Sequence, residues 1–263
     1  MLSLNNKVAV ITGGANGLGK ALAKELFSQG FNLALIDIDE TALQKLKSEL
    51  RSESQKITTH LCDISSENLI IKVRDEVLIE HGRIDILINN AGVSMSMNFD
   101  DTALLDFLNI INVNFLGTVY CTKHFLSDLK KQADSRIVNI ISTFALLCFP
   151  GKSAYASSKS SIMGFTNSLR TELYNSSIKV CLVIPPPLST NIVKSGKHMN
   201  DADRKKEESY LNKNGMPLDK AAQKIILKIK AGKYRIVIGS IVRYLDIAAR
   251  FFPSIIHAII GKK

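Results

Sequence analysis

Residues that build disulfide bonds or metal sites are scarce in this sequence. The four cysteines are scattered, at Cys62, Cys121, Cys148 and Cys181, and no C-x-x-C pair occurs. The five histidines are equally isolated. Scattered cysteines are typical of free thiols in a reducing compartment, whereas a zinc site needs several ligands at short, regular spacings. We therefore expect no disulfide framework, no metal centre and a cytoplasmic location.

The sequence also lacks features that would divide the chain or direct it out of the cell. We see no charged start followed by an apolar segment and a cleavage site, so we expect no secretion signal. We find no internal repeat, low-complexity tract or interdomain linker. A chain of 263 residues, of which 46% are hydrophobic and 22% charged, fits one globular α/β domain.

Positive charge is unevenly distributed along the chain. Residues 194–263 hold 16 Lys and Arg against 6 Asp and Glu, whereas residues 1–193 hold 18 of each. The whole net charge of +10 therefore lies in the C-terminal quarter. Such asymmetry concerns partners and surfaces rather than the fold. The basic region contains no recognisable nucleic-acid-binding module, and we expect no nucleic-acid partner.

Short β-branched apolar segments alternate with longer segments of helical periodicity. The expected strands are residues 7–12, 32–36, 56–62, 84–88, 136–141, 178–184 and 235–238. The expected helices are residues 20–29, 39–53, 65–82, 102–131, 153–176 and 217–231. The alternation predicts a doubly wound, Rossmann-like α/β domain over residues 1–240, with a parallel seven-stranded sheet covered on both faces. Residues 188–215 are polar with little periodicity, and we expect a mobile substrate flap there.

A glycine-rich turn follows the first expected strand and precedes the first expected helix. It reads GGANGLG from Gly13 to Gly19. Glycines permit a tight turn and a close approach of the backbone to a ligand, and a helix N-terminus offers free N–H groups and the positive end of its dipole to a pyrophosphate. The segment therefore predicts a dinucleotide site, with a plain tight loop as the alternative.

Asp37 ends the second expected strand, 24 residues after Gly13. Dinucleotide-binding folds place an acidic residue there, which binds the adenosine ribose hydroxyls and repels a 2′-phosphate. Its neighbours Ile38 and Asp39 carry no positive charge, and Asn16 in the turn is uncharged. These residues favour NAD, with NADP as the alternative. Asp37 as a helix cap is a second interpretation, because a helix follows at once.

Tyr155 and Lys159 lie four residues apart in an expected helix, which places them on one face. A nearby ammonium favours the phenolate, so we expect Lys159 to lower the pKa of Tyr155 from its usual value of about 10. Such a phenol can exchange a proton with an alcohol or carbonyl oxygen. Taken alone, the pair also fits an ordinary solvated helix face.

Several signatures in order resemble the short-chain dehydrogenase/reductase family, in its single-domain branch. They are the turn Thr12–Gly19, the run Asn89-Asn90-Ala91-Gly92, Asn114, Ser142 at a strand end, and Tyr155-x-x-x-Lys159. The resemblance extends over about residues 5–240. No single signature is decisive, but the ordered set is highly specific.

The resemblance implies roles for the matched positions. Tyr155 is expected to be the catalytic acid/base, Lys159 to hold the nicotinamide ribose, Ser142 to orient the substrate oxygen and Asn114 to hold a water of a proton relay. The implied cofactor-binding residues are Gly13, Asn16, Gly17, Leu18, Gly19, Asp37, Asp63, Asn89, Ala91, Gly92, Tyr155, Lys159 and Thr190. Of these, Asp63 is expected at the adenine, Asn89 near the ribose and Thr190 at the nicotinamide carboxamide. For Asn114, a solvated or locally bonded helical amide is the alternative. The resemblance also implies a homodimer or homotetramer.

The sequence departs from the family pattern after the sixth expected strand, where Pro185-Pro186-Pro187 replaces the usual Pro-Gly. A backbone N–H contact from residue 186 to the cofactor is impossible, so the geometry on the nicotinamide side is expected to differ. The predicted activity is hydride transfer between a secondary alcohol and its ketone. The alternatives are an NADPH-dependent 3-oxoacyl reductase and a non-catalytic dinucleotide-binding scaffold. The presence of Ser142, Tyr155 and Lys159 argues against the scaffold.

Two apolar segments bear on the substrate and partners. Residues 144–150 (FALLCFP) should line the substrate pocket, which suggests a hydrophobic alcohol or ketone; packing into the protein or a partner subunit is the alternative. Residues 241–260 read as one apolar helix with a narrow polar stripe. Its three charges and Pro253 argue against a membrane span. For residues 241–263 we expect packing on the body or a partner subunit, with peripheral membrane contact as the alternative.

Overall fold

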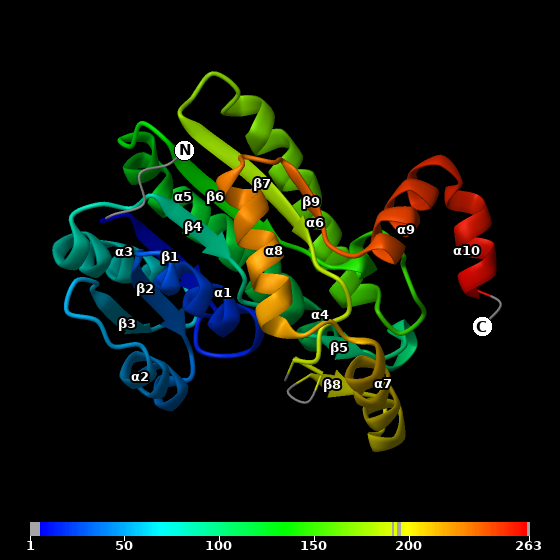
Figure 1. Cartoon of the computed structure of the whole chain (residues 1–263). Coiled ribbons are helices and arrows are strands. Elements are labelled where there is room, and N and C mark those ends of the chain that lie inside the picture. Colours follow the sequence, from blue (N-terminus) through cyan, green and yellow to red (C-terminus); the bar gives the residue numbers. More distant parts are fainter. Residues whose placement is uncertain (1–5, 191, 194–195, 262–263) are drawn as a thin grey trace.

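The protein folds around one sheet, shown in Figure 1 as a computed structural model that describes residues 6–190, 192–193 and 196–261. Its strands, in chain order, are β1 (Val8–Thr12), β2 (Asn32–Asp37), β3 (Ile57–Leu61), β4 (Ile86–Asn89), β6 (Ser135–Ile140), β7 (Ile178–Ile184) and β9 (Arg235–Val237). They pair in the order β3-β2-β1-β4-β6-β7-β9, and every pair is parallel. The predicted doubly wound, seven-stranded sheet is confirmed.

Helices cover both faces of the sheet because successive strand residues point to opposite sides. Ala9 and Ile11 of β1 join one apolar core, whereas Val10 joins the other. The first core is covered by α1 (Gly17–Ser28), α2 (Glu40–Glu49) and α8 (Leu218–Lys230) (Figure 1). The second core is covered by α3 (Glu67–His81), α5 (Gly117–Lys130) and α6 (Ser153–Glu172).

The expected helix over residues 102–131 is one continuous helix with an irregular turn. It consists of α4 (Leu104–Ile111), the π-helical turn η2 (Asn112–Leu116) and α5. By length and composition it could cross a membrane, and the bent pair α9–α10 described below meets the same criterion when taken together. In α5, Cys121, Phe125 and Leu129 are fully buried in the core beneath the sheet.

The segment expected to be a mobile substrate flap, residues 188–215, contains regular structure. Strand β8 (Lys197–His198) pairs with β5 (Met95–Ser96), and α7 (Asp201–Asn214) follows it. Helix α7 begins at Asn200, whose side chain accepts a hydrogen bond from the Asp203 amide at 2.9 Å. It buries none of its residues fully, and ion pairs such as Arg204–Glu208 support it. A helix that is polar on nearly all sides shows no apolar period, which explains why the sequence did not indicate it.

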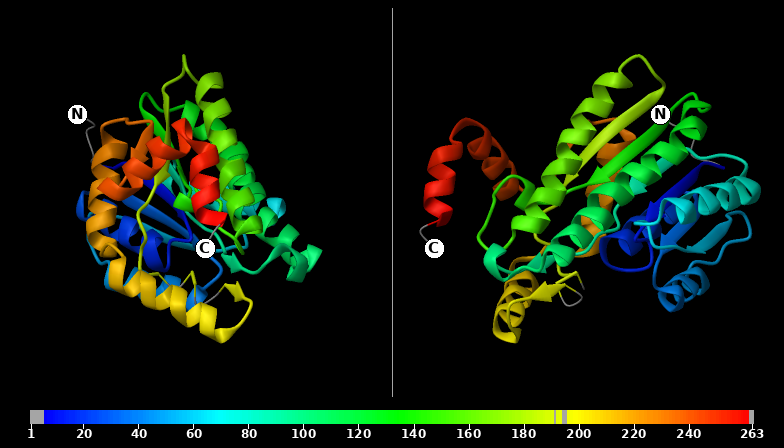
Figure 2. Two further views of the ribbon diagram at one scale, coloured as in Figure 1. Left: turned by 90° about the vertical axis from the view of Figure 1, so that its right-hand side faces the viewer. Right: turned by 180° about the vertical axis from the view of Figure 1, so that it is seen from behind.

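The C-terminal segment forms two helices, where the sequence predicted one. Helix α9 (Ser240–Phe251) and helix α10 (Pro253–Gly261) are bent by 117° at the break. Proline cannot donate to the preceding turn and clashes with it, so the first helix ends before Pro253. Figure 2 shows this pair projecting from the body beside β9. Asp246 anchors α9, since its carboxylate accepts from Arg235 at 2.5 and 3.0 Å.

Candidate active site

The predicted site residues follow the carboxyl ends of the strands, which meet at one end of the sheet. Thr12 at the end of β1 ties this region together. Its hydroxyl oxygen accepts hydrogen bonds from the amides of Asn90 and Ala91, at 3.0 and 3.1 Å. The turn after β1 therefore lies directly against the turn after β4. We call this region the carboxyl end of the sheet.

The glycine turn has a geometry that only glycine supplies. Gly13 and Gly17 have φ angles of +62° and +52°, in the left-handed region. A Cβ on Gly13 would lie 2.8 Å from Ala91 Cα, and a Cβ on Gly19 would lie 1.9 Å from the Gly13 carbonyl oxygen. Helix α1 begins at Gly17, three residues earlier than predicted, so its amino end, with Leu18 in its first turn, opens within the turn.

Asn16 precedes α1 but does not cap it with its side chain. Its amide nitrogen instead donates to Asp39, at 3.2 Å. The N–H groups of the first turn of α1 therefore keep their capacity to bind an anion. A narrow backbone cradle at a helix N-terminus fits a dinucleotide pyrophosphate, which was the predicted occupant.

Asp37 lies beside the glycine turn and does not cap the following helix. Its carboxylate accepts from the Ala15 amide at 3.0 Å and from the Asp39 amide at 3.2 Å. Asp39 is the residue that caps α2, accepting from the Ala42 amide at 2.9 Å. The helix-cap interpretation of Asp37 is therefore wrong, and its position fits a ribose ligand.

Asp63 follows β3 and lies on the surface. Its carboxylate accepts from the amide and the hydroxyl of Ser65, at 2.9 and 2.8 Å. These local bonds form an Asx-type turn that leads into α3. The structure thus places Asp63 at the end of a strand neighbouring Asp37, while its carboxylate already serves the turn.

The two asparagines after β4 have different surroundings. Asn89 is buried, and its amide nitrogen donates to Thr122 at 3.0 Å and to Asn139 at 2.8 Å, which ties β4 to α5 and β6. Asn90 points to the glycine turn, donating to the carbonyl oxygens of Thr12 and Gly13, both at 3.1 Å. The turn is therefore supported by Asn90, a residue to which the sequence analysis gave no role.

Asn114 lies in the π-helical turn and is completely buried. Its side chain accepts from the Val93 amide at 2.8 Å and donates to the Val93 carbonyl at 3.0 Å and the Ser158 hydroxyl at 2.9 Å. A Cβ on Gly92 would lie 2.9 Å from the Asn114 carbonyl oxygen and 3.3 Å from Lys159 Nζ. Asn114, Gly92 and Lys159 thus converge at one point, and the solvated alternative for Asn114 is wrong.

Tyr155 and Lys159 lie on α6 at the same end of the sheet, with Lys159 Nζ 5.9 Å from the centre of the Tyr155 ring. Lys159 Nζ donates to the Ile140 carbonyl at 3.2 Å. Both side chains are buried, and burial lowers the pKa of Lys159 to about 8. Burial is the cause of that pKa shift, and among the described residues Lys159 is hydrogen-bonded to a neutral carbonyl oxygen.

The expected direction of the Tyr155 pKa shift is wrong for this structure. Burial raises the pKa of Tyr155 to about 12, because it disfavours the phenolate. The Ser142 hydroxyl acts in the opposite direction, and the carboxylate of Glu207 adds to the rise. Ser142 itself follows β6 and caps a short turn, accepting from the Phe144 amide at 3.2 Å. Ser142 and Tyr155 therefore lie together, as the strand-end and helix positions predicted.

Thr190 returns from β7 to the glycine turn. A Cβ built on Gly17 would lie 3.4 Å from Thr190 Cγ2. The intervening Pro186 packs near Gly239, whose added Cβ would lie 3.6 Å from Pro186 Cβ. The proline run therefore does not prevent the chain after β7 from reaching the site.

An apolar wall of two phenylalanine rings borders Tyr155. The Phe144 ring meets the Tyr155 ring edge-on, with centres 6.0 Å apart, and meets Phe149 in the same way at 5.6 Å. Phe149 also lines a cavity of about 470 Å³ with Phe99, Cys148, Pro150 and Ile260. No pattern in the sequence indicates that Ile260, at the end of α10, reaches this cavity.

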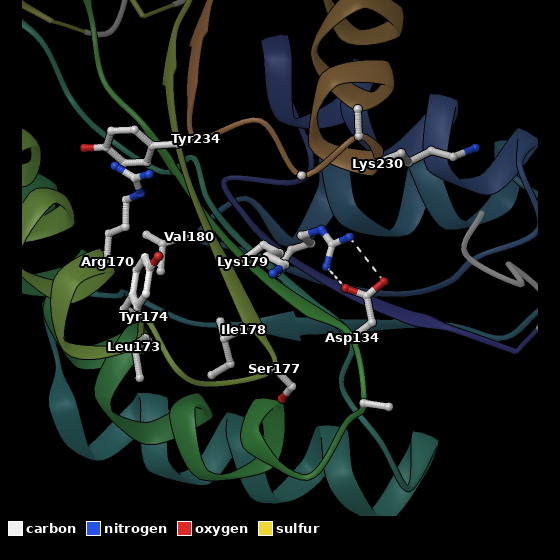
Figure 3. Close-up of a pocket in the computed structure, with 14 residues that line it drawn as sticks. Asp134, Arg170, Leu173, Tyr174, Ser177, Ile178, Lys179, Val180, Lys230 and Tyr234 are labelled. Atoms are coloured by element: carbon white, nitrogen blue, oxygen red, sulfur yellow. Dashed lines mark hydrogen bonds and ion pairs between the residues drawn. The ribbon is translucent and has the colours of Figure 1, made fainter.

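A larger hollow, of about 620 Å³, lies at the opposite, amino end of β6 and β7, as Figure 3 shows. Three of its four basic side chains have structural partners, and the fourth, Lys179, is exposed. Arg136 pairs with Asp134, the Arg170 guanidinium lies 4.0 Å from the centre of the Tyr234 ring, and Lys230 donates to Gln29 at 2.9 Å. None of the predicted site residues lines this hollow.

Comparison with a family model matches residues 7–201 to the short chain dehydrogenase family. Among curated proteins, the chain is 31% identical to a putative oxidoreductase, SadH, of Mycobacterium tuberculosis, over 97% of this chain and 94% of that protein.

Two solved structures illustrate the likeness of the fold. One is a short chain dehydrogenase/reductase from Burkholderia phymatum in complex with NAD, with a TM-score of 0.89 and 24% identity over 98% of this chain and 96% of that one. The other is an alcohol dehydrogenase from Thermococcus sibiricus complexed with 5-hydroxy-NADP, with a TM-score of 0.78 and 23% identity over 90% and 97% of the two chains.

Proposed function

The chain belongs to the short-chain dehydrogenase/reductase family of oxidoreductases, and on that premise we propose that it interconverts a hydrophobic secondary alcohol and its ketone, with NAD as the cofactor. The observation that carries this proposal is the convergence of Ser142, Tyr155 and Lys159 at the carboxyl end of the sheet, where Lys159 lies beside Gly92 in the turn after β4. Proton exchange on a substrate oxygen and placement of a nicotinamide are the two tasks such a site must perform.

In this proposal the cofactor is held by the glycine turn, Asp37 and Lys159. NAD supplies the hydride acceptor for alcohol oxidation, which is chemistry that no side chain provides. Asp37 favours NAD over NADP because a carboxylate beside the adenosine ribose repels a 2′-phosphate. Positions 16, 38 and 39 are Asn, Ile and Asp, and the lack of a basic side chain at these positions also favours NAD.

The proposed work of the protein is to move one proton at the substrate oxygen. Ser142 donates a hydrogen bond to that oxygen, and Tyr155 exchanges a proton with it through its phenol. With a pKa of about 12, the phenol keeps its proton at neutral pH and is suited to protonate the oxygen as a ketone is reduced. Lys159, whose Nζ lies 5.9 Å from the centre of the Tyr155 ring, holds the nicotinamide ribose beside the phenol in this proposal.

The hydrophobic substrate class is supported by the aromatic wall beside Tyr155. A panel of secondary alcohols and ketones of increasing apolar size, run with both NAD and NADP, tests it by nicotinamide absorbance. We expect long-chain or polycyclic substrates with NAD to be the best. Good turnover of small polar alcohols alone would overturn the substrate class, and activity on 3-oxoacyl compounds with NADPH alone would favour that reductase. No turnover by any member of the panel would favour the scaffold.

We also propose that the chain self-associates as a homodimer or homotetramer. Leu104, Leu105 and Leu108 of α4 are exposed on a helix that continues into the core. Exposed leucines grouped on one helix are typical of a protein interface. Sedimentation analysis of Leu105→Ser against the parent protein tests this; an unchanged mass would argue against α4 as the contact.

For the pair α9–α10 we propose contact with an anionic membrane surface. Exposed apolar residues recur along both helices, namely Ile241, Tyr244, Ile247, Phe251, Phe252, Ile255 and Ile259. Basic side chains lie near one another where α9 joins the body of the protein. Arg243 and Lys224 are near enough to Lys228 for their charges to lower its pKa, and the charge of Arg250 acts to lower the pKa of Tyr234. An anionic surface complements this charge, whereas a second copy would bring the same charge.

Co-sedimentation with anionic and neutral phospholipid vesicles tests the membrane proposal. We expect Phe251→Ser with Phe252→Ser to weaken binding to anionic vesicles, since both side chains are exposed. Equal binding by the parent and the variant, or none by either, would overturn it. A change in oligomeric state instead would assign the surface to a second copy.

A further inference from the structure

Lys152 is a buried cation that the proposed chemistry does not use. It immediately precedes α6 and lies three residues before Tyr155. Only 7% of its surface is exposed, and burial lowers its pKa. An ammonium in such a place is costly unless it is paired. Its partner is Glu207, whose two carboxylate oxygens accept from Lys152 Nζ at 2.7 and 2.9 Å.

The pair joins three segments that are far apart in the sequence. Lys152 belongs to the start of α6 and Glu207 to the middle of α7, while Ser96 of β5 bonds to both side chains. The same region is supported by the pairing of β5 with β8 and by the Met199 amide, which donates to the Ser96 carbonyl at 3.0 Å. His198 Nδ1 lies 4.0 Å from Glu207. Glu207 is therefore the residue through which α7 contacts β5 and the start of α6.

This contact lies one aromatic ring away from the proposed catalytic phenol. Lys152 Nζ is 5.1 Å from the centre of the Phe144 ring, and that ring meets Tyr155 edge-on. A change at the ion pair can thus alter both the seating of α7 and the apolar wall beside Tyr155.

We propose that the Lys152–Glu207 ion pair seats helix α7 against the substrate side of the active site, and that Lys152 and Glu207 are positioning residues for substrate binding. The part that concerns substrate rests on the proposed function, whereas the seating of α7 does not. A buried pair suits this task because removing one partner leaves the other charge buried without compensation.

A second ion pair provides a matched control. Lys197 Nζ lies 2.5 Å from Asp106, and it also joins the segment before α7 to the body of the protein. Lys197 keeps 63% of its side chain exposed, against 8% for Lys152. Exposed pairs contribute little in water, so the proposal predicts different outcomes for the two pairs.

The first measurement is hydrogen–deuterium exchange of the α7 amides in the full chain, which needs no substrate. We expect Glu207→Gln to speed exchange in α7 by about tenfold or more, and Asp106→Asn to leave it nearly unchanged. A double-mutant cycle combines Lys152→Met with Glu207→Gln. In the double variant, the α7 amides should exchange more slowly than the sum of the two single-variant effects would predict. Unchanged exchange in Glu207→Gln, or equal acceleration in both single variants, would overturn the seating of α7.

The second measurement separates KM from kcat for the best substrate of the panel. We expect Glu207→Gln to raise KM by about tenfold with kcat within about threefold, because the seating of α7 changes while the Glu207 carboxylate makes the smallest of the three contributions to the pKa of Tyr155. Faster exchange in α7 with an unchanged KM would overturn the positioning role while leaving the contact itself intact. If the parent protein shows no turnover, the exchange result still decides the seating, and the failure then belongs to the proposed function.

Discussion

Each end of the sheet carries a buried cation, and the two cations are similarly exposed but have different kinds of partner. Lys159 at the carboxyl end and Arg136 at the amino end are 4% and 5% exposed. Arg136 has a carboxylate partner in Asp134 and donates to the carbonyls of Ser135 and Ile229 at 3.0 and 3.2 Å. Among the described residues, the hydrogen-bond partner of Lys159 is the carbonyl of Ile140. The larger hollow lies at the end where the cations are paired, so cavity size does not mark the site, whereas a buried cation without a carboxylate does.

The largest expected effect separates the tyrosines of the two ends. Tyr155→Phe should reduce kcat by about 10²–10⁴-fold, because it removes the proton that the phenol exchanges, while binding of NAD stays close to normal. Tyr234→Phe, in the hollow at the amino end, should leave kcat unchanged. Steady-state kinetics with calorimetric titration of NAD measure both. Equal losses in the two variants would show that the ends do not differ as proposed.

The next contrast is in stability. Lys159→Met should abolish most turnover yet raise the free energy of unfolding of the cofactor-free protein by roughly 1–3 kcal/mol, since a buried cation without a carboxylate is replaced by an apolar side chain. Arg136→Met should lower that free energy by about 1–3 kcal/mol, because it leaves the carbonyls of Ser135 and Ile229 without their donor. Urea denaturation measures both, and a loss of stability in Lys159→Met would contradict the contrast.

The pH dependence of stability sharpens the same comparison. The pKa of Lys159 falls from 10.5 to about 8 on folding, so between these values the unfolded chain binds more protons than the folded one. Stability contributed by this group therefore rises with pH across that window and is constant below it. Urea midpoints at pH 7.5, 9 and 10.5 should show this rise in the parent protein and a smaller one in Lys159→Met. Parallel curves would argue that Lys159 is not buried as a cation.

The smallest expected effect is on cofactor binding, and it compares Asp37 at the carboxyl end of the sheet with Asp134 at the amino end. Asp37→Asn should weaken binding of NAD by about tenfold and narrow the preference over NADP, because the carboxylate beside the glycine turn is lost. Asp134→Asn should leave the affinity for both cofactors unchanged, although it weakens the pair with Arg136. Fluorescence titration of both dinucleotides compares them. An unchanged NAD/NADP ratio in Asp37→Asn would remove Asp37 from cofactor selection.

The sequence predicted what depends on strand order and short spacing. The carboxyl ends of parallel strands meet at one end of a sheet, so the residues after β1, β4, β6 and β7 had to converge. What it could not predict depends on long-range contacts. The pairing of Lys152 with Glu207 joins residues 55 apart in sequence. Glu207 lies in a polar helix, α7, whose sequence has no apolar period. The direction of the Tyr155 pKa shift depends on burial, which the four-residue spacing does not reveal.

Local chemistry decided the remaining differences. Asp39 rather than Asp37 caps α2, and either acid fits the sequence pattern that precedes a helix. The apolar periodicity of residues 241–260 predicted one helix, although Pro253 within that range disfavours a continuous helix. In both places a single residue outweighed a correct general pattern.

The π-helical turn at Asn112–Leu116 has a consequence for how the site tolerates change in chain length. A regular helix rotates by about 100° per residue, and a π turn accommodates one extra residue within an otherwise regular helix. Deleting one residue there would restore the regular ladder and rotate the Asn114 amide away from Val93 and Ser158, although no motif residue need be lost. The phase of this helix, and not only its composition, keeps the turn after β4 joined to the helix that carries Lys159.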